Sequence, residues 1–391
     1  MSDTQYVAKW GIMATGGIAE TFAKDLLTNP AIRGVTDVRH EIVAVGASRS
    51  SDKATDFIKR IKGPASAKCY GSYAELVNDP NVDIVYVATP HSHHFQNTML
   101  ALEAGKHVLC EKSFTVTASQ TKKLVETARL KGLFLMEAVW TRFFPSSIEI
   151  RDLISSGAIG NIHRVTGDFS FNINDETGNL ALDDSHRLAS SELAGGALLD
   201  LGIYPITWVF QTLYHLWSDG DKEKPRVIAA INQHHTGVDE MTSIILQFPL
   251  HKAMGIALTT FRVATDPDGK GTSGPVVRIQ GSLGEIQVFG CAPKPSKYNL
   301  LKKGNEPKEF ECVYPKDAER DNWGHGMYWE ADECVRCLRD GKLESQTMSL
   351  EESIVIMETM EEVLKQGGVE YPEAIKTDVY DPKSSLNAGG R

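Results

Sequence analysis

The amino-terminal segment constrains the fold most strongly, because it places a glycine-containing turn between an apolar strand and a helix. Residues 6–13 are predicted to form the strand and residues 18–28 the helix. Small residues at the positions G-x-G-x-x-G/A let the backbone approach a pyrophosphate at the helix amino terminus. Ala14 holds the first of these positions, and Gly16 and Ala19 hold the others. The segment predicts a dinucleotide-binding turn whose cofactor contacts come from Ala14, Thr15, Gly16, Gly17 and Ile18.

Strands and helices continue to alternate up to about residue 138. The predicted strands are 6–13, 41–47, 83–89, 107–110 and 133–137, and the predicted helices are 18–28, 51–61, 72–78, 93–104 and 117–131. From about residue 162 β-rich runs follow one another without helices between them, which indicates a largely antiparallel sheet; they are 163–172, 227–234, 242–248, 253–261, 276–281 and 284–289. We expect an α/β Rossmann dinucleotide-binding domain over residues 1–138 and an α+β domain with a large, mostly antiparallel open-faced sheet over residues 139–391.

The end of the chain contains two further helical patterns. Residues 328–339 and 350–365 carry apolar residues at helical spacing, and we expect these helices to pack back on the scaffold. After Asp381 the serine, asparagine and glycine residues predict a loose tail. The exposed face of the open sheet is expected to pair with a second subunit, which predicts a homodimer.

The residues after the second strand bear on the choice of cofactor. NAD-selective proteins usually end this strand with an acidic residue that binds the ribose hydroxyls. This chain has Ser48, Arg49 and Ser50 there instead. A guanidinium can stack on adenine and pair with a 2′-phosphate, and the two hydroxyls can donate hydrogen bonds. We therefore predict NADP rather than NAD; the alternative is a solvated arginine in a polar turn.

A histidine-rich loop follows the strand predicted over residues 83–89. It begins at Thr89 and Pro90 and contains His91, His93 and His94. Three histidines in four residues suggest a metal, but no nearby cysteine, aspartate or glutamate completes a ligand set. We therefore interpret the loop as a cofactor-lining segment and predict no metal site.

Two segments supply a predicted catalytic pair. Lys112 follows the strand 107–110, at the carboxyl end where open parallel sheets hold their ligands. Asp200 and Tyr204 are four residues apart, so they share one face of a helix. An ammonium beside a phenol favours the phenolate and lowers the tyrosine pKa from about 10, which makes the tyrosine a usable proton acceptor for alcohol oxidation. Asp200 is expected to orient the pair, and the division of proton transfer between Lys112 and Tyr204 stays open.

Two further groups of residues are candidates for substrate contact. They are Trp140, Arg142, Phe143 and Phe144 after the fifth strand, and His186 and Arg187 in a polar loop. Aromatic faces stack on the apolar face of a pyranose, and an arginine bonds its hydroxyls. Packing at the domain junction explains the aromatic residues equally well, and polar loops are usually solvated.

Composition limits the classes of partner. The net charge of −10 and the absence of a basic run argue against nucleic acid and anionic membranes. The first strand begins near residue 6, so we expect no signal peptide, and we expect no apolar run as long as a membrane span. The six cysteines are scattered, which favours reduced thiols. A cytoplasmic location is expected.

The motifs together resemble the glucose-fructose oxidoreductase, inositol dehydrogenase and rhizopine-catabolism (Gfo/Idh/MocA) superfamily. The resemblance rests on the glycine turn, on Thr89-Pro90 with His94, on Glu111-Lys112 and on Asp200-x-Gly-x-Tyr204. Residues 136–145 and 195–204 look like those of dimeric dihydrodiol dehydrogenases and fungal NADP-dependent D-xylose 1-dehydrogenases, and the likeness covers nearly the whole chain. Ser113 stands where the superfamily commonly has proline, and Ala14 where it has glycine.

This resemblance implies NADP-dependent oxidation of an aldose at C1 to the lactone, with D-xylose as the first candidate substrate and Glu111 and Lys112 among the cofactor-lining residues. Two alternatives stay open. One is oxidation of aromatic trans-dihydrodiols in a pocket lined by Trp140 and Phe143. The other is a non-catalytic NADP-sensing regulator, although such proteins have typically lost the catalytic lysine and this chain keeps both Lys112 and Tyr204.

Overall fold

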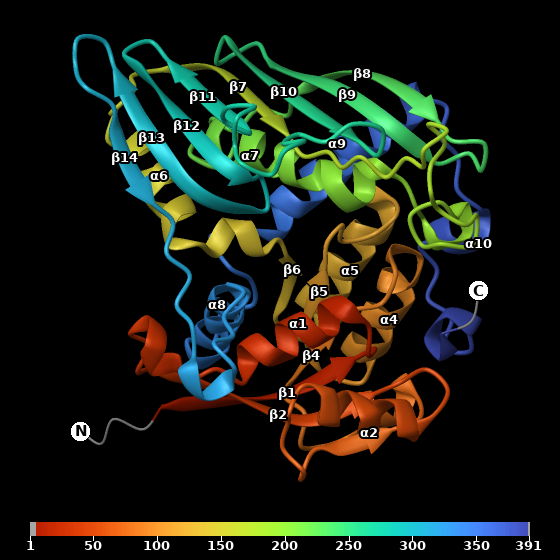
Figure 1. Ribbon diagram of the computed structural model, residues 1–391. Coiled ribbons are helices and arrows are strands. Elements are labelled where there is room, and N and C mark those ends of the chain that lie inside the picture. The colour runs from red at the N-terminus through yellow and green to blue at the C-terminus, as the bar shows by residue number, and fades with distance from the viewer. Residues whose placement is uncertain (1–4, 390–391) are drawn as a thin grey trace. The chain divides into compact units, whose positions relative to one another are not determined.

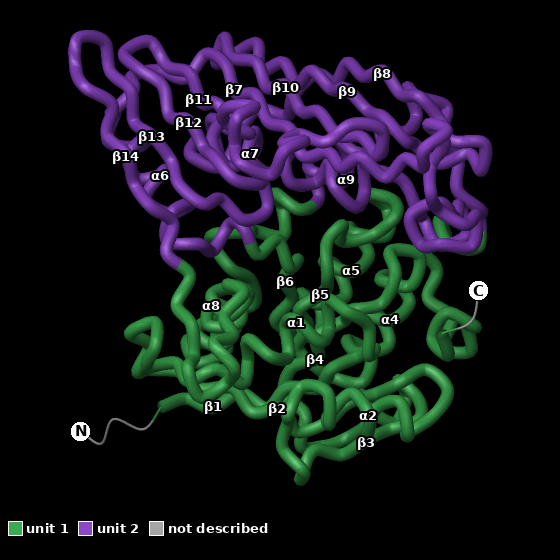
Figure 2. Tube along the Cα trace, in the orientation of Figure 1, with its two compact units in different colours: residues 1–140, 314–353, 374–391 green, residues 141–313, 354–373 purple. Residues whose placement is uncertain are grey.

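The computed structural model describes residues 5–389 and is shown in Figure 1. The chain divides into two compact units, which Figure 2 distinguishes by colour. Unit 1 comprises Met1–Trp140, Tyr314–Ser353 and Ala374–Arg391, and unit 2 comprises Thr141–Val313 and Ile354–Glu373. Each unit is therefore assembled from segments that are far apart in the sequence.

Unit 1 is built on a six-stranded parallel sheet. Its order is β3-β2-β1-β4-β5-β6, which is the order of a Rossmann fold and confirms the predicted class. The strands are β1 (Tyr6–Met13), β2 (Val38–Gly46), β3 (Lys68–Tyr70), β4 (Ile84–Val87), β5 (His107–Glu111) and β6 (Leu135–Ala138). Every residue of β4 is buried, as expected for a strand covered on both faces. The three-residue edge strand β3 was not predicted, because it is too short to show a period.

Helices surround this sheet, and three of them, α2, α3 and α5, begin at a capping side chain. They are α1 (Gly17–Leu26), α2 (Ser51–Arg60), α3 (Tyr73–Val77), α4 (His91–Glu103), α5 (Ala118–Lys131), α8 (Tyr328–Arg339) and the short α10 (Glu373–Lys376). The most completely capped is α5, where Thr117 and Gln120 form a capping box and Gly132 ends the helix at a φ of 64°. A buried carboxylate, Asp332, joins α8 to the sheet by pairing with Arg33 and His40. The helix predicted over residues 328–339 is thus part of the Rossmann unit.

Unit 2 contains an eight-stranded sheet of order β14-β13-β12-β11-β7-β10-β9-β8. The strands are β7 (Ile162–Asp168), β8 (Arg226–Gln233), β9 (Asp239–Phe248), β10 (Ala253–Thr260), β11 (Val277–Gly281), β12 (Gly284–Cys291), β13 (Lys294–Lys302) and β14 (Lys308–Glu311). Only the β7–β10 pair is parallel, so the mostly antiparallel sheet was predicted correctly. The strand β13 was missed because its second residue, Pro295, is unusual in a strand; it faces Gly290 at a register shift, where the ladder tolerates proline.

Helices cover one face of this sheet (Figure 1). They are α6 (Pro145–Ser155), α7 (Ile203–Leu213) and most of α9 (Leu350–Gln366). The helix α7 packs on β7 and β10, and Gly255 permits this close approach because a Cβ there would lie 2.3 Å from Val209. On the other face apolar side chains remain exposed on neighbouring strands; they are Ile228, Ile245, Met254 and Leu258.

The segment Ser191–Leu213 departs from one expectation. By length and composition it is apolar enough to cross a membrane, so the prediction that no run approaches a membrane span was wrong. The stretch of this segment with the highest mean hydropathy is completely buried inside the protein. A core helix of this kind passes the same compositional test as a membrane span, and the burial accounts for its hydropathy.

The carboxyl-terminal residues also differ from their prediction. After Asp381 the chain forms a short 3₁₀ helix, Ser385–Ala388, in which Leu386 and Asn387 are buried. The buried Asn97 of α4 donates to Leu386 O and Asn387 Oδ1, at 3.1 and 3.0 Å. The prediction of a loose tail was therefore wrong up to Gly389, because the contacts that hold it come from a helix nearly 300 residues earlier.

Candidate active site

The turn between β1 and α1 has the features that a dinucleotide requires. Gly16 caps α1 without a side-chain hydrogen bond, and a Cβ at Gly16 or Gly17 would meet nothing within 4 Å. The turn is therefore open beside a backbone that a phosphate can approach. Ile18, in the same turn, is 40% exposed although it is apolar. The carbonyl of Thr15 accepts a hydrogen bond from Arg60 at 3.1 Å, which holds the backbone of the turn in place.

Ala14 has a φ of 84°, which is the left-handed region that favours glycine. We expect Ala14→Gly to stabilise the fold by about 1 kcal/mol, because the Cβ is strained at this φ. The matched control is Ala54→Gly in α2, where helical backbone makes glycine destabilising by about 1 kcal/mol. Thermal unfolding of the two variants should shift in opposite directions, and a decrease for both would contradict the argument.

The three residues after β2 differ in their surroundings. Ser50 caps α2 by accepting a hydrogen bond from the Asp52 N–H at 3.1 Å. Ser48 is partly exposed and Arg49 is exposed. Arg49 donates from Nη2 to the carbonyl of Gly389 at 3.0 Å. The guanidinium predicted to bind a 2′-phosphate is therefore anchored by the end of the chain, which no local sequence signal indicates.

The loop from β4 to α4 places its polar groups in different roles. Pro90 is the amino-terminal cap of α4, and His91 begins the helix. Thr89 Oγ1 is buried and has no hydrogen-bond partner within residues 5–389, so it offers a donor and an acceptor to a ligand. His94 lies 2.8 Å from the carbonyl of Thr89 and 2.8 Å from that of Ser113. Burial lowers the pKa of His94 to about 4, so the neutral ring donates to one of these carbonyls and links the two loops.

Lys112 is the first residue after β5, at the carboxyl end of the parallel sheet, as predicted. The peptide bond from Lys112 to Ser113 is cis. Glu111 is buried, accepts a hydrogen bond from the Tyr86 hydroxyl and faces the Lys112 N–H at 3.3 Å. Contacts with Glu111 and with His94 therefore hold the backbone on both sides of the lysine in place.

The loop after Lys112 rests on a carboxylate that the sequence analysis missed. Glu137, on the neighbouring strand β6, is completely buried. Its Oε1 accepts from the Phe114 N–H at 3.0 Å, and its Oε2 accepts from Ser353 at 2.8 Å. A glutamate inside an apolar strand was the available signal, since such a residue is rarely buried without hydrogen-bond partners.

A third buried carboxyl group belongs to Glu330 in α8. Neither of its oxygens has a hydrogen-bond partner within residues 5–389. Burial raises its pKa well above the usual value, and the charges of Glu111 and Asp25 act in the same direction. Glu330 lies on the buried face of a helix that was predicted from its apolar periodicity. The sequence therefore indicated that Glu330 is helical, but not which charged groups lie near it.

Asp200 and Tyr204 belong to unit 2 and share a continuous helical segment. Asp200 lies in a π-helical turn over Leu198–Gly202, and Tyr204 lies in the first turn of α7. Both are largely buried, at 8% and 6% exposure. Arg187 donates from Nη1 and Nη2 to the two oxygens of Asp200, at 2.9 and 3.3 Å. The structure thus joins two predicted site residues, and Arg187, predicted as a substrate contact, supports Asp200.

Two glycines allow the Arg187 loop to reach this helical segment. A Cβ at Gly195 would lie 2.8 Å from the Arg187 carbonyl and 2.6 Å from that of Leu188. Gly196 has a φ of 115° and donates to the Leu188 carbonyl at 2.8 Å. Glycines at these positions therefore let the backbone of the loop pack against the start of the helix.

Asp239, at the start of β9, fixes the other side of the same segment. Its Oδ2 accepts from the Leu198 N–H at 2.8 Å and from the Thr242 hydroxyl at 2.7 Å. It is completely buried, and burial raises its pKa to about 6. The sequence analysis missed it, because only the folded chain brings residues 198 and 239 together.

The raised pKa of Asp239 predicts a pH dependence of stability. Between its usual pKa and about 6, the folded state binds a proton that the unfolded state has lost, so the stabilisation is complete below about pH 4 and is lost as the pH rises through about 6. The change is about 3 kcal/mol. Urea unfolding should show wild type losing this amount relative to Asp239→Asn between about pH 4 and about pH 7. A constant difference between the two proteins would contradict the assignment.

The predicted aromatic contacts are mostly packed. Trp140 stacks on His325 of the same unit, with centroids 4.8 Å apart and planes at 10°. In unit 2, Arg142 is completely buried and Phe143 is 5% exposed. His186 is exposed, and its Nδ1 accepts from the Leu188 N–H at 3.2 Å. Direct sugar contacts by these residues stay predictions.

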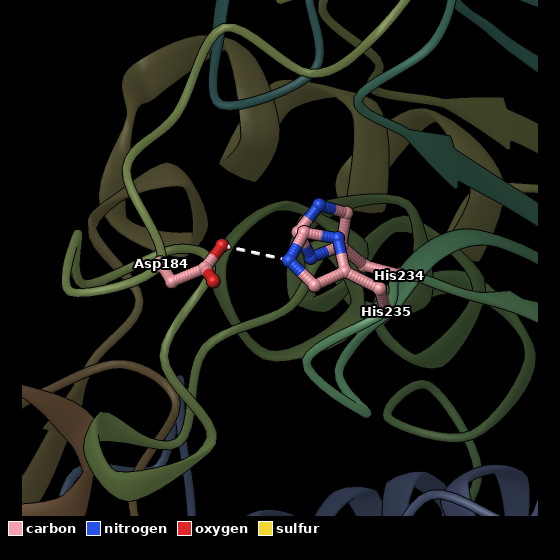
Figure 3. Close-up of side chains that lie close together, drawn as sticks. All are labelled: Asp184, His234 and His235. Atoms are coloured by element: carbon pink, nitrogen blue, oxygen red, sulfur yellow. Dashed lines mark hydrogen bonds and ion pairs between the residues drawn. The ribbon is translucent and has the colours of Figure 1, made fainter.

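A second group of polar side chains holds the loop that carries His186 and Arg187 (Figure 3). Asp184 pairs with His235 at 2.8 Å, and His235 lies beside His234, with ring centroids 3.9 Å apart. His234 Nδ1 contacts the Thr236 hydroxyl at 2.9 Å. The three side chains each offer one possible metal-ligand atom within 4.8 Å of the others. Asp184 and His235 are exposed and His234 is buried. The exposed pair ties the loop to the β8–β9 turn and adds little stability.

The comparisons identify the family. Residues 8–139 match the oxidoreductase family with an NAD-binding Rossmann fold (GFO/IDH/MocA), and residues 148–287 match the GFO/IDH/MocA C-terminal domain. The chain therefore belongs to this family of oxidoreductases.

Within the family, D-xylose 1-dehydrogenase (NADP⁺) of Hypocrea jecorina is 65% identical over 391 residues, covering 100% of both chains. Human trans-1,2-dihydrobenzene-1,2-diol dehydrogenase is 35% identical and covers 93% of this chain and 98% of its own. The aldose-aldose oxidoreductase from Caulobacter crescentus, solved with glycerol, has the same fold with a TM-score of 0.72. It is 20% identical and covers 92% of this chain and 97% of its own.

Proposed function

We propose that this protein is an NADP-dependent D-xylose 1-dehydrogenase, which oxidises the sugar at C1 to D-xylonolactone. The observation that carries the proposal is the 65% identity, over the whole of both chains, to an enzyme of that activity. Lys112 at the carboxyl end of β5 and Tyr204 at the start of α7 supply the polar groups for such a reaction. The more distant dihydrodiol dehydrogenases, at 35% identity, make aromatic trans-dihydrodiols the second candidate substrates.

The residues around the Rossmann sheet fit the cofactor. The open glycine turn would hold the pyrophosphate, Arg49 and Ser48 the 2′-phosphate, and the buried Thr89 hydroxyl a further polar group. When bound, NADP accepts the hydride that leaves C1. The protein binds and orients both molecules and excludes water from them.

Proton transfer falls to Tyr204 and Lys112. Tyr204 accepts the proton of the C1 hydroxyl as the C1–H bond breaks and the carbonyl forms. Lys112 donates a hydrogen bond to the oxygen on which negative charge develops. Asp200, held by Arg187, keeps the tyrosine's helical segment oriented.

The test is NADPH formation by purified protein with D-xylose, D-glucose, L-arabinose and a trans-dihydrobenzenediol, using NADP or NAD. The highest kcat/KM is expected with D-xylose and NADP. A preference for the dihydrodiol would replace the proposal with the second candidate. NADP binding without turnover on any substrate would overturn both and favour the regulator.

The choice of NADP is tested separately through Arg49. Arg49→Ala should raise the Kd for NADP by about tenfold or more and leave the Kd for NAD unchanged, because only NADP carries the 2′-phosphate that a guanidinium binds. The control is Arg39→Ala, since Arg39 lies on the exposed part of β2 and pairs with Glu41. An unchanged preference for NADP in Arg49→Ala would remove Arg49 from the site.

We also propose that the protein is a homodimer that pairs through the exposed sheet face of unit 2. The support is a row of exposed apolar side chains on β8, β9 and β10: Ile228, Ile245, Met254 and Leu258. Light scattering should give twice the chain mass for wild type and the chain mass for Ile245→Lys. A monomeric mass for wild type at micromolar concentration would contradict this proposal.

A cytoplasmic location is proposed as well. All six cysteines are free thiols, which suits a reducing compartment. Fractionation of the producing cells tests this directly, and recovery in the secreted or membrane fraction would contradict it.

A further inference from the structure

The carboxyl-terminal segment from Val379 to Gly389 is fixed to the Rossmann unit by side chains of α4. Gln96 donates to the Val379 carbonyl at 2.9 Å and accepts from the Asp381 N–H at 3.0 Å. The next residue of α4, Asn97, donates to Leu386 O and Asn387 Oδ1. Gln96 and Asn97 are buried, at 3% and 0% exposure. Because buried amides are costly to leave without partners, α4 and the segment stabilise each other.

The segment ends against the residues that follow β2. Gly389 terminates the 3₁₀ helix Ser385–Ala388 with a φ of 64°. A Cβ at Gly389 would lie 2.3 Å from the Cβ of Ser48, so only glycine allows this approach. The carbonyl of Gly389 accepts the hydrogen bond from Arg49 Nη2 at 3.0 Å. Two of the three residues assigned to the 2′-phosphate therefore touch one glycine from the other end of the chain.

We propose that this segment, residues 379–389, is part of the NADP site and sets the preference for NADP by holding the Arg49 guanidinium in place. The inference rests on the proposed role of Arg49. A guanidinium has five N–H donors, so one bond to Gly389 leaves the others for a phosphate. An exposed arginine otherwise samples many rotamers, and fixing it beforehand reduces the entropy that NADP binding must remove.

This role predicts an effect that depends on the 2′-phosphate. A segment that merely stabilised the fold would affect NADP and NAD equally. A segment that competed with the phosphate for Arg49 would tighten NADP binding when displaced. Pre-organisation of Arg49 instead predicts weaker binding of NADP and unchanged binding of NAD.

The test compares full-length variants by titration calorimetry with NADP and with NAD. Gly389→Ala introduces the clash with Ser48, and Asn387→Ala removes the bond from Asn97 without altering a glycine. Each should raise the Kd for NADP by about five- to tenfold, as expected for a weakened charge-assisted hydrogen bond, with the Kd for NAD unchanged. The control is Gly132→Ala, which has the same φ of 64° but no atom within 4 Å of the added Cβ; it should leave both Kd values unchanged.

The outcomes separate this inference from the proposal on which it rests. If Arg49→Ala weakens NADP but both segment variants bind NADP as wild type does, the inference is overturned and the role of Arg49 stands. Equal weakening of NADP and NAD, or tighter NADP binding, also overturns it. If Arg49→Ala itself leaves NADP binding unchanged, the role of Arg49 fails and the inference fails with it.

Discussion

Lys112→Met is expected to lower kcat/KM for sugar oxidation by about three orders of magnitude, which is the range for losing a general acid–base group or a donor to a developing oxyanion. Methionine keeps much of the length of the side chain and removes its charge. Without the ammonium, the oxygen on which negative charge develops loses a hydrogen-bond donor. The loss should appear mainly in kcat, because the interaction is made in the transition state.

The surroundings of Lys112 allow this loss to be separated from misfolding. The loop around it is held by Glu111, by Glu137 and by His94, none of which uses the lysine side chain in the bonds described above. The Kd for NADP should therefore change by no more than about threefold. Lys123→Met is the matched control, because Lys123 is an exposed lysine of the same unit that pairs with Glu126. Activity of Lys112→Met within about tenfold of wild type would remove the lysine from the mechanism.

Local sequence patterns were sufficient for the parts of the fold with a strong period or a marked turn. The strand β4, the glycine turn and the position of Lys112 all follow from a few neighbouring residues, because apolar runs and glycines act within one element. Strands that are short or contain proline gave no such signal, which explains why β3 and β13 were missed. The apolar segment around α7 was predicted to be helical, which the structure confirms, but its membrane-like hydropathy was overlooked.

The supports of the candidate site could not be predicted, because each depends on residues distant in the sequence. Asp239 holds the start of the helical segment that carries Asp200, 41 residues away. Gly389 anchors Arg49 across 340 residues. A sugar contact by Arg187 stays a prediction, and the structure adds an ion pair of Arg187 with Asp200 that the sequence did not indicate. Residue type indicates which chemistry is available, but the partners that orient it are fixed only when the chain is folded.

Removing the carboxylate of Asp25 is expected to be the most destabilising single substitution proposed for unit 1. Asp25, in the last turn of α1, is completely buried. It accepts hydrogen bonds from four successive N–H groups before and at the start of α8: those of His325, Gly326, Met327 and Tyr328, at 2.8, 2.8, 2.6 and 3.3 Å. One side chain thereby satisfies the donors that a helix amino terminus leaves unpaired. Burial raises the pKa of Asp25, and these bonds to the ionised form oppose that increase.

Asp25→Ala should therefore lower the free energy of unfolding by about 3–5 kcal/mol, because it leaves these buried N–H groups without an acceptor. Asp25→Asn keeps one carbonyl oxygen as an acceptor and should lose about half as much. The control, Asp56→Ala on the exposed face of α2, removes only a surface pair with Lys59 and should change stability by less than about 0.5 kcal/mol. Urea unfolding followed by circular dichroism measures all three variants. If Asp25→Ala were no less stable than Asp56→Ala, α8 would not depend on this carboxylate for its place on the Rossmann sheet.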